Sequence, residues 1–334
     1  MKNRVTPERI MQFAWGYAPT LIIAAAVEHH LFDLLDESPK TIAELARKSG
    51  ASPRGLTAIA NALVGFNFLS RKGDRYGLTP ESAAFLVSTK PGFLGGLYRH
   101  MSSQIMPKWL ELGRVVRSGK PADSVNEQKQ GAAFFAGFVE ALFPMGYHVA
   151  KTLGEKLQIS KTKKPISVLD IAAGSGVWGI ALAEQSPLVR ISAVDWPEVL
   201  KVTKRVAKRH GVADRLAVIP GDLLKVDFGS GHQVATLGHI LHSEGRERSQ
   251  RLLRKVFQAL ESGGTIVIAE FVPNDERTGP PAPLIFAVNM LVNTAEGDTF
   301  TFAEMSRWLR AAGFKNPRKL DAGGPSPLIL ATKP

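Results

Sequence analysis

From residue 166 to the C-terminus, short apolar segments alternate with helical segments, and this alternation constrains the fold more than any other feature of the chain. Such a pattern is typical of a parallel, doubly wound sheet with helices on both faces. We therefore predict an α/β fold for this half of the chain. The expected strands are Ile166–Asp170, Val189–Val194, Leu216–Ile219, Val234–Leu237, Thr265–Glu270 and Leu328–Thr332, and the expected helices are Trp178–Gln185, Glu198–His210, Glu247–Leu260 and Phe302–Ala312.

Two helix start signals lie between residues 40 and 60. Thr41 and Glu44 have the spacing of a capping box, in which each side chain accepts a hydrogen bond from a backbone N–H group of the first turn. Ser52 is followed by Pro53, which is the favoured order of N-cap and first helical residue. We therefore predict two consecutive helices in this region.

A hairpin is predicted after the second of these helices. Residues 68–71 and 75–78 flank the turn Lys72-Gly73-Asp74, and helices followed by such a hairpin are typical of a winged helix. The second helix would read DNA in a winged-helix protein, but here it offers only Arg54 as a cation. This composition favours a dimerisation module over a DNA-binding one.

The longest apolar stretch, residues 13–27, is too short to span a membrane. It contains Gly16 and Pro19 and falls short of the roughly 20 apolar residues that a span requires. An amphipathic pattern follows it directly, so we predict one long N-terminal helix, Pro7–Leu35, rather than a cleaved leader. Such a helix presents apolar surface that a monomer covers poorly. We expect a homodimer without membrane attachment, located in the cytoplasm.

The formal charge of +12 raises the question of a nucleic-acid partner. Residues 150–215 hold 12 basic and 6 acidic side chains, which is half of the surplus. Within the predicted helix 198–210 the cations recur on one side, and no aromatic residues lie between them as a base-stacking surface would need. We interpret this basic stripe as a solvated helix face and expect no nucleic-acid partner. The stripe consists of Lys201, Lys204, Arg205, Lys208 and Arg209.

The chain divides into three parts on these patterns: 1–100, 101–165 and 166–334. The middle part is mostly helical in pattern, with a polar break at 118–130 and a phenylalanine-rich stretch after it. The polar, helix-breaking tract 160–165 marks the entrance to the third part.

A turn rich in small residues follows the first strand of the third part. Across Val168–Gly179 a buried strand runs through this turn into a helix, so that the backbone can approach a ligand closely. Asp195 ends the second strand, 19 residues after Gly176, where a carboxylate can accept hydrogen bonds from ribose hydroxyls. Gly221-Asp222-Leu223 follow the third strand, where they could hold an adenine.

The same turn matches the G-x-G-x-x-G pattern of dinucleotide-binding dehydrogenases over Gly174–Gly179. Asp170 argues against this alternative, because a carboxylate four residues before the first glycine would repel a pyrophosphate but would suit the cationic end of S-adenosylmethionine. Here the sequence resembles the class I S-adenosylmethionine-dependent methyltransferases, whose first motif is an acid followed by G-x-G-x-G or a close variant. The corresponding stretch, Ala172–Gly176, has alanine where glycine is common.

The resemblance extends over nearly the whole chain to the caffeate and hydroxyneurosporene O-methyltransferase family. It implies a winged-helix dimerisation domain, a helical linker that lines the substrate pocket, and a Rossmann-like methyltransferase sheet. The sheet would end in an antiparallel hairpin, here Arg318–Leu320 and Leu328–Thr332. The implied cofactor is S-adenosylmethionine, with contacts from Asp170, Gly174, Gly176, Asp195, Trp196, Gly221, Asp222, Leu223 and Gly238.

A Leu-His-Asp-Trp motif follows the fourth strand in that family, and its histidine is the general base. The corresponding residues here are Leu241-His242-Ser243-Glu244, so the resemblance puts His242 on the base position. Serine and glutamate replace aspartate and tryptophan, and Gly238 stands where many relatives have lysine. An imidazole can remove the proton of a phenol at neutral pH.

The resemblance further suggests Glu270 as the carboxylate that orients His242, with Glu296 or Asp298 as a second such group. His239 is the rival base. The chain has no cysteine, which excludes thiolate nucleophiles and cysteine-ligated metals, and we expect no metal in the site.

The substrate pocket is expected between the helical linker and residues 283–298. An apolar lining rich in methionine and phenylalanine suits a flat aromatic acceptor, although the same residues would serve as plain core. The loop 273–281 could form its rim. The candidate lining residues are Phe138, Leu142, Met145, Phe286, Asn289 and Met290.

These observations predict an O-methyltransferase that acts on a hydroxyl of a small aromatic or polycyclic compound. Two alternatives stay open. One is an N- or C-methyltransferase, or a member of the fold that does not transfer methyl groups, because Ser243 and Glu244 depart from the family motif. The other, from a different class of protein, is a winged-helix transcriptional regulator.

Overall fold

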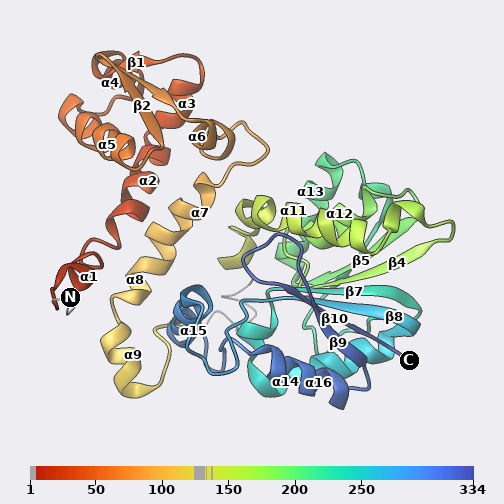
Figure 1. The fold of residues 1–334 in the computed structure, drawn as a ribbon. Helices are drawn as coiled ribbons and strands as arrows, with labels where there is room; N and C mark the ends of the chain where they lie inside the picture. Colours follow the sequence, from red (N-terminus) through yellow and green to blue (C-terminus); the bar gives the residue numbers. More distant parts are fainter. Residues whose placement is uncertain (1–4, 124–131, 133, 137) are drawn as a thin grey trace. The chain divides into compact units, whose positions relative to one another are not determined.

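The computed structural model describes residues 5–123, 132, 134–136 and 138–334. The chain divides into two compact units, residues 1–107 and 108–334 (Figure 1). The stretch expected as a separate helical linker, 101–165, is thus split, with most of it in the larger unit. The polar break expected at 118–130 lies largely outside the described residues.

The smaller unit combines helices with a three-stranded sheet of order β1-β3-β2. The predicted capping box is present, since the Thr41 hydroxyl accepts a hydrogen bond from the Glu44 N–H and the Glu44 carboxylate accepts one from the Thr41 N–H. The predicted helix pair and hairpin are also confirmed. The elements are α3 (Leu31–Asp36), β1 (Lys40–Thr41), α4 (Ile42–Ser49), α5 (Pro53–Gly65), β2 (Leu69–Lys72), β3 (Arg75–Leu78), α6 (Pro80–Phe85), α7 (Gly95–His100) and the π-helical η1 (Met101–Ile105), with α8 (Met106–Trp109) at the division.

The single long helix expected at Pro7–Leu35 is wrong. The segment forms α1 (Glu8–Met11) and α2 (Ala18–Glu28), and α3 starts separately after them. His30 has a left-handed backbone (φ 55°), which ends the helical path before α3. Apolar periodicity runs on across such a break, and so the pattern alone suggested one helix.

A seven-stranded sheet of order β6-β5-β4-β7-β8-β10-β9 forms the centre of the larger unit. The first five strands in this order run parallel, whereas β10 runs antiparallel to both β8 and β9. The predicted doubly wound sheet and its antiparallel C-terminal hairpin are therefore confirmed. The strands are β4 (Ile166–Ile171), β5 (Val189–Asp195), β6 (Leu216–Pro220), β7 (His232–Gly238), β8 (Leu260–Ala269), β9 (Lys315–Leu320) and β10 (Leu328–Thr332).

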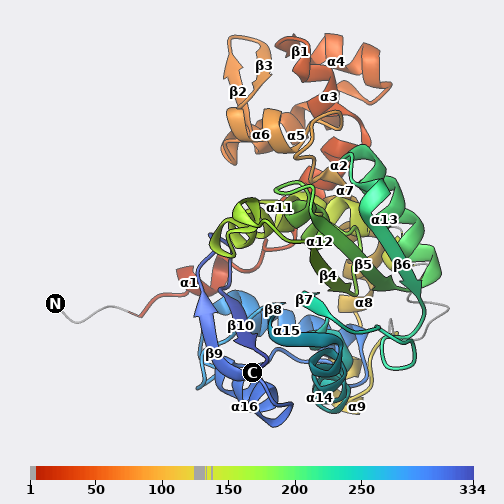
Figure 2. The ribbon, with the colours of Figure 1, turned by 90° about the vertical axis from the view of Figure 1, so that its right-hand side faces the viewer.

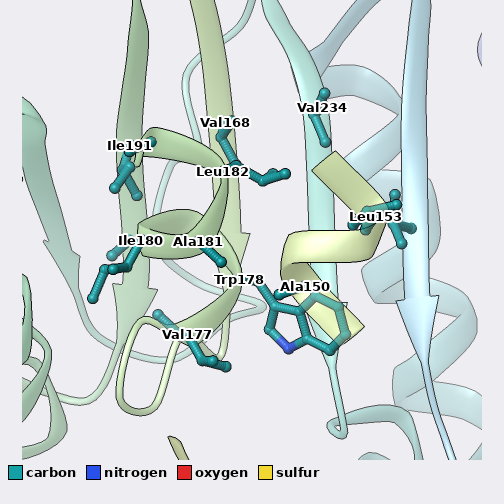
Figure 3. Close-up of a cluster of buried hydrophobic side chains, with 14 of the residues drawn as sticks. Ala150, Leu153, Val168, Val177, Trp178, Ile180, Ala181, Leu182, Ile191 and Val234 are labelled. Carbon is teal, nitrogen blue, oxygen red and sulfur yellow. The ribbon is translucent and has the colours of Figure 1, made fainter. Parts of the chain in front are cut away.

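Helices cover both faces of this sheet, as Figures 1 and 2 show: α11, α12 and α13 on one face and α14 and α16 on the other. Side chains of α11 and α12 gather over β4, β5 and β7 (Figure 3). The helices are α9 (Leu112–Ser118), α11 (Val139–Lys156), η2 (Ile159–Lys161), α12 (Val177–Ala183), α13 (Pro197–Arg209), η3 (Ala213–Arg215), α14 (Leu241–Ala259), α15 (Pro281–Asn293) and α16 (Phe302–Ala311).

The basic stripe of α13 is partly used inside the larger unit. Arg205 and Arg209 both form ion pairs with Glu140 of α11, whereas Lys201 pairs with its helical neighbour Glu198. Two of the stripe's cations thus hold α11 and α13 together. In the described part of the chain, no helix combines the length and the apolar character needed to cross a bilayer.

Candidate active site

The strand order places a topological switch point at the carboxyl ends of β4 and β7. The chain passes from β4 outward to β5 and β6 and then returns to β7 on the other side of β4. Ligands of doubly wound folds bind at such a switch point. The predicted cofactor and base residues follow the ends of β4, β5, β6, β7 and β8, so the fold gathers them along one edge of the sheet.

The turn after β4 holds its backbone in conformations that favour glycine. Ala172, Gly174 and Gly176 all have positive φ, at 52°, 57° and 78°. A Cβ on Gly176 would lie 2.9 Å from Thr203 Cγ2, and the Thr203 hydroxyl donates a hydrogen bond of 2.7 Å to the Gly174 carbonyl. Alanine at 172 carries the strain that glycine would avoid.

Asp195 is tied to this turn from the end of β5. Its carboxylate accepts hydrogen bonds from the N–H groups of Gly174 (2.8 Å) and Trp196 (2.7 Å), and the residue is only half-buried. Desolvation raises the pKa of this carboxyl to about 6 although both hydrogen bonds favour the charged form. A partly exposed carboxylate beside the turn is suited to accept hydrogen bonds from a diol.

Asp170, which was predicted to contact the cofactor, is buried and bonded within the protein. Its side chain is fully buried, and its two oxygens accept hydrogen bonds from the Gly179 N–H (3.1 Å) and the Thr236 hydroxyl (2.7 Å). Burial raises the pKa of its carboxyl to about 7, so the charge invoked against a pyrophosphate is also weakened. Asp170 therefore holds the turn from beneath, between α12 and β7.

The residues after β6 form a second tight turn next to Asp195. The Gly221 N–H donates to the Asp195 carbonyl (2.9 Å) at a φ of 140°. The Asp222 carboxylate accepts a hydrogen bond from the Leu224 N–H (2.8 Å) and lies 3.7 Å from the guanidinium of Arg248. Leu223 is buried beside it.

His242 is held by a buried carboxylate. It lies in the first turn of α14, where its Nδ1 is 2.7 Å from Glu270 Oε2 and its backbone N–H donates to Glu270 Oε1 (3.2 Å). Burial would raise the pKa of Glu270, but the nearby His242 outweighs it and the pKa is lowered. The two bonds fix the orientation of the imidazole, as in catalytic histidine–carboxylate pairs.

The backbone around His242 is clamped by the chain that follows α15. The Asp298 N–H donates to the His242 carbonyl (2.9 Å), and a Cβ on Gly297 would lie 2.6 Å from that same oxygen. Gly245 interrupts the helical backbone of α14 (φ 73°, ψ 174°), and a Cβ there would lie 2.6 Å from the Glu296 carbonyl. Both glycines permit the close approach.

The rings of Phe271 and Phe286 form an aromatic wall beside His242. Phe286 was predicted as a pocket residue, whereas Phe271 was missed. Phe271, directly after Glu270, is stacked on Phe286 of α15 with ring centroids 4.0 Å apart. Phe286 also meets the His242 ring edge to face at 4.9 Å. A phenylalanine following a predicted catalytic carboxylate was the available signal. His239, the rival base, packs against Phe271 at 5.1 Å.

Neither suggested second carboxylate, Glu296 or Asp298, is hydrogen-bonded to the His242 ring among the described residues. The Glu296 side chain is exposed and has no hydrogen bond or ion pair within the described ranges, and the Asp298 carboxylate pairs with Arg277 at 3.3 Å. Glu244, which stands where the family motif has tryptophan, pairs with Arg248 instead (2.6 Å).

The expected substrate residues divide into two groups. On α15, Phe286 lies at His242, Met290 is buried, and the Asn289 amide oxygen accepts a hydrogen bond from the Trp109 indole (2.9 Å). Phe138 precedes α11 and packs on Phe135. Leu142 of α11 is half-buried, and Met145 of the same helix is 50% exposed.

A doubly wound sheet with an antiparallel end, a glycine turn after β4 and a carboxylate at the end of β5 defines a class I methyltransferase. The chain belongs to the O-methyltransferase family: the model of the O-methyltransferase domain matches residues 115–315, and that of the O-methyltransferase dimerisation domain matches residues 11–88. The predicted family, fold and enzymatic activity are thus confirmed.

Individual relatives agree with this assignment. The chain is 28% identical to the tetracenomycin polyketide synthesis 8-O-methyl transferase TcmO of Streptomyces glaucescens, covering 98% of this chain and 97% of the relative. It is also 28% identical to the 3-hydroxy-5-methyl-1-naphthoate 3-O-methyltransferase of Streptomyces sahachiroi, over 96% and 92%. The structure of PigF with S-adenosylhomocysteine, from a Serratia species, matches with a TM-score of 0.85 and 26% identity over 98% and 100%. None of these comparisons supports a transcriptional regulator.

The enzyme is an S-adenosylmethionine-dependent O-methyltransferase, and the residues present fit this cofactor. The Asp195 carboxylate is partly exposed at the glycine turn, and the backbone of that turn is kept close to it by the Gly174 N–H. A Cβ on Gly174 would be in ordinary contact with Val139 of α11, at 3.7 Å from its Cγ1.

Proposed function

We propose that the acceptor of this O-methyltransferase is a hydroxyl group on a small aromatic compound. The observation that carries the proposal is the position of His242, which is bonded to Glu270 on one side and faced by the Phe286 ring on the other. The stacked pair of Phe271 and Phe286 offers a flat apolar surface beside this imidazole. The naphthoate O-methyltransferase relative acts on an aromatic hydroxyl according to its name, which supports the same acceptor class.

His242 is the proposed general base. Its Nδ1 is engaged with Glu270, so its Nε2 is the atom to receive the proton of the acceptor hydroxyl. S-adenosylmethionine supplies a methyl group on a sulfonium, whose C–S bond breaks as the C–O bond forms, with S-adenosylhomocysteine as the second product. Glu270 then stabilises the imidazolium and keeps its ring aligned.

Asp195 is the proposed ribose ligand, because its carboxylate is half-exposed next to the turn. Gly174 and Gly176 would let the methionine part of the cofactor approach the backbone. Asp222 and Leu223 are proposed to hold the adenine, and Gly238 to border the site at the end of β7. Trp196 is proposed as a further cofactor contact, since it directly follows Asp195.

We also propose that the active form is a homodimer assembled through the smaller unit. Several large apolar side chains near the N-terminus of that unit are exposed, and the dimerisation-domain match, residues 11–88, covers all of them except Ile10. Several exposed apolar side chains close together are unfavourable in water unless a partner covers them. The residues are Ile10, Met11, Phe13, Trp15 and Tyr17.

The proposed acceptor class and base are tested together by methyl transfer from labelled S-adenosylmethionine to a panel of naphthols and of aromatic amines. We expect transfer to naphthols and a fall in kcat of about 10²- to 10⁴-fold in His242→Asn, with unchanged binding of S-adenosylhomocysteine. The conservative exchange His148→Asn, at an exposed histidine of α11, is the control. Full turnover by His242→Asn would refute the base, and transfer to amines alone would refute the acceptor class.

A further inference from the structure

We propose that His239 binds a second oxygen of the acceptor, and that the enzyme therefore prefers aromatic compounds with oxygens on two neighbouring ring positions. This inference rests on the proposed function of His242. It assigns a specificity role to a residue that the methyl-transfer step itself does not require.

The geometry of the two histidines matches such a pair of oxygens. One nitrogen of His239, one of His242 and a carboxylate oxygen of Glu270 all lie within 4.8 Å of one another, and the imidazole centroids are 6.3 Å apart. Oxygens on neighbouring ring carbons are about 2.7 Å apart, close to the length of one O–H···O hydrogen bond. Because the two imidazoles are this close, His239 and the free Nε2 of His242 can each bind one oxygen of such a pair, whereas oxygens on distant ring positions cannot engage both.

The His239 ring has no other polar role in the described part of the chain. Its ring contacts the rings of His242 and Phe271, and the residue is exposed while His242 and Glu270 are buried. Desolvation by the surrounding protein lowers the pKa of His239, although the negative charge of Glu270 acts in the opposite direction. A neutral imidazole has one donor and one acceptor nitrogen, so it can bind either a hydroxyl or a carbonyl oxygen.

The backbone at His239 is fixed in an unfavourable conformation. Its φ is 60°, in the left-handed region where glycine and asparagine are preferred, and its N–H donates to the Ala269 carbonyl (2.8 Å). Residues held in this way are concentrated at ligand sites. This hydrogen bond holds His239 next to Ala269, the residue that directly precedes Glu270.

The aromatic wall connects the two histidines. His239 contacts Phe271, His242 contacts Phe286, and these two phenylalanine rings stack on each other. A flat acceptor lying along this wall would present one edge to both imidazoles. Binding of the second oxygen to His239 would thus determine which compounds are accepted. It would also determine which ring position of the compound is methylated.

Naphthalene-2,3-diol and naphthalene-2,7-diol test the inference, because they differ only in the spacing of their hydroxyls. The measurement is the ratio of kcat/KM for the 2,3-diol over the 2,7-diol, taken once with EDTA and once with added Zn²⁺. His239→Asn removes the imidazole but suits the left-handed backbone, and His148→Asn is the matched control. We expect the ratio to fall about tenfold in His239→Asn, as for the loss of one buried hydrogen bond, and to be unchanged in His148→Asn.

An unchanged ratio in His239→Asn, with both diols still methylated, would overturn the inference and leave the proposed function intact. Failure of the wild-type enzyme to methylate either diol or any naphthol, despite binding S-adenosylhomocysteine, would instead remove the proposed function on which the inference rests. A ratio that depends on added Zn²⁺ and collapses with EDTA would also overturn it, because the histidines would then act as metal ligands.

Discussion

Trp178 of α12 fills the space that a side chain at position 238 would need. A Cβ on Gly238 would lie 2.6 Å from Trp178 Cδ1 and closer still to its Nε1. Trp178 is 5% exposed and packs in the apolar cluster of Figure 3, so its ring cannot swing away freely. This tryptophan explains why position 238 takes glycine in this chain.

We expect Gly238→Ala to destabilise the enzyme by about 1–3 kcal/mol, the usual cost of overpacking. Thermal unfolding with and without S-adenosylhomocysteine measures the effect. Gly238→Ala combined with Trp178→Leu should cost less than the sum of the two single changes, since the shorter side chain frees the space. A double variant no more stable than the sum of the single changes predicts would show that the two sites do not interact.

Cofactor binding should weaken in acid because of Asp195. Its folded-state pKa is raised to about 6, so between pH 7 and pH 5 the carboxylate becomes protonated and must lose that proton to accept two ribose hydrogen bonds. We expect the Kd for S-adenosylhomocysteine to rise about tenfold over this range, with proton release on binding detected by calorimetry in buffers of different ionisation enthalpy. In Asp195→Asn binding should be weak and flat with pH. An equally steep profile in that variant would exclude Asp195.

Glu270→Gln should separate catalysis from cofactor binding. The amide keeps the shape but loses the charge that orients and stabilises His242, so we expect kcat to fall at least about a hundredfold with little change in the KM for S-adenosylmethionine. Because the pKa of Glu270 is lowered in the folded protein, its charge stabilises the fold at pH values above its ordinary pKa of 4.5. This contribution is lost as the pH falls through the folded-state pKa. The variant should accordingly lose less stability on acidification. Retention of wild-type kcat would argue against the pair.

The proposed dimer should depend on the exposed N-terminal aromatics. Phe13 and Trp15 are 78% and 69% exposed within the smaller unit. We expect Phe13→Asp with Trp15→Asp to convert a dimer into a monomer in light scattering, because a charge at a buried interface is costly. Leu110→Asp, at an apolar residue that is 88% exposed in the larger unit, is the control. A dimer that survives the double change would place the interface elsewhere.

We expect no sequence-specific binding of DNA despite the charge of +12. Arg205 and Arg209 are already paired with Glu140, and α5 carries Arg54 alone as a cation. Mobility shifts across a salt series should show complexes that disappear near physiological ionic strength, as for purely electrostatic binding. A complex with one DNA sequence that persists there would revive the regulator alternative.

Local patterns in the sequence predicted those parts of the fold that depend on neighbours in the chain. The capping box at Thr41 and the strands that begin at Ile166, Val189 and Leu328 were located from residue types and spacing. The break at His30 was missed, because a single left-handed residue leaves the apolar periodicity intact.

Contacts between distant residues account for what sequence reasoning could not reach in the site. Asp170 is occupied by Thr236, 66 residues away, and this partner was invisible in the motif that suggested a ligand contact. The wall of Phe271 and Phe286 likewise depends on the meeting of β8 with α15. His242 and Glu270 were identified only through the family resemblance, since a histidine after a strand carries little information by itself.

The clamp on the His242 backbone has a consequence for how such enzymes change. Phe286 faces the proposed acceptor side of the imidazole, and Asp298 holds the His242 carbonyl. These two residues lie twelve positions apart on one continuous segment. A substitution in α15 that enlarges the pocket for a new acceptor will therefore also shift the alignment of the base. A broader choice of acceptors and a slower turnover should thus arise together. Restoring speed should need further changes within residues 286–298 rather than at Gly245 or Gly297, which have no room for a side chain.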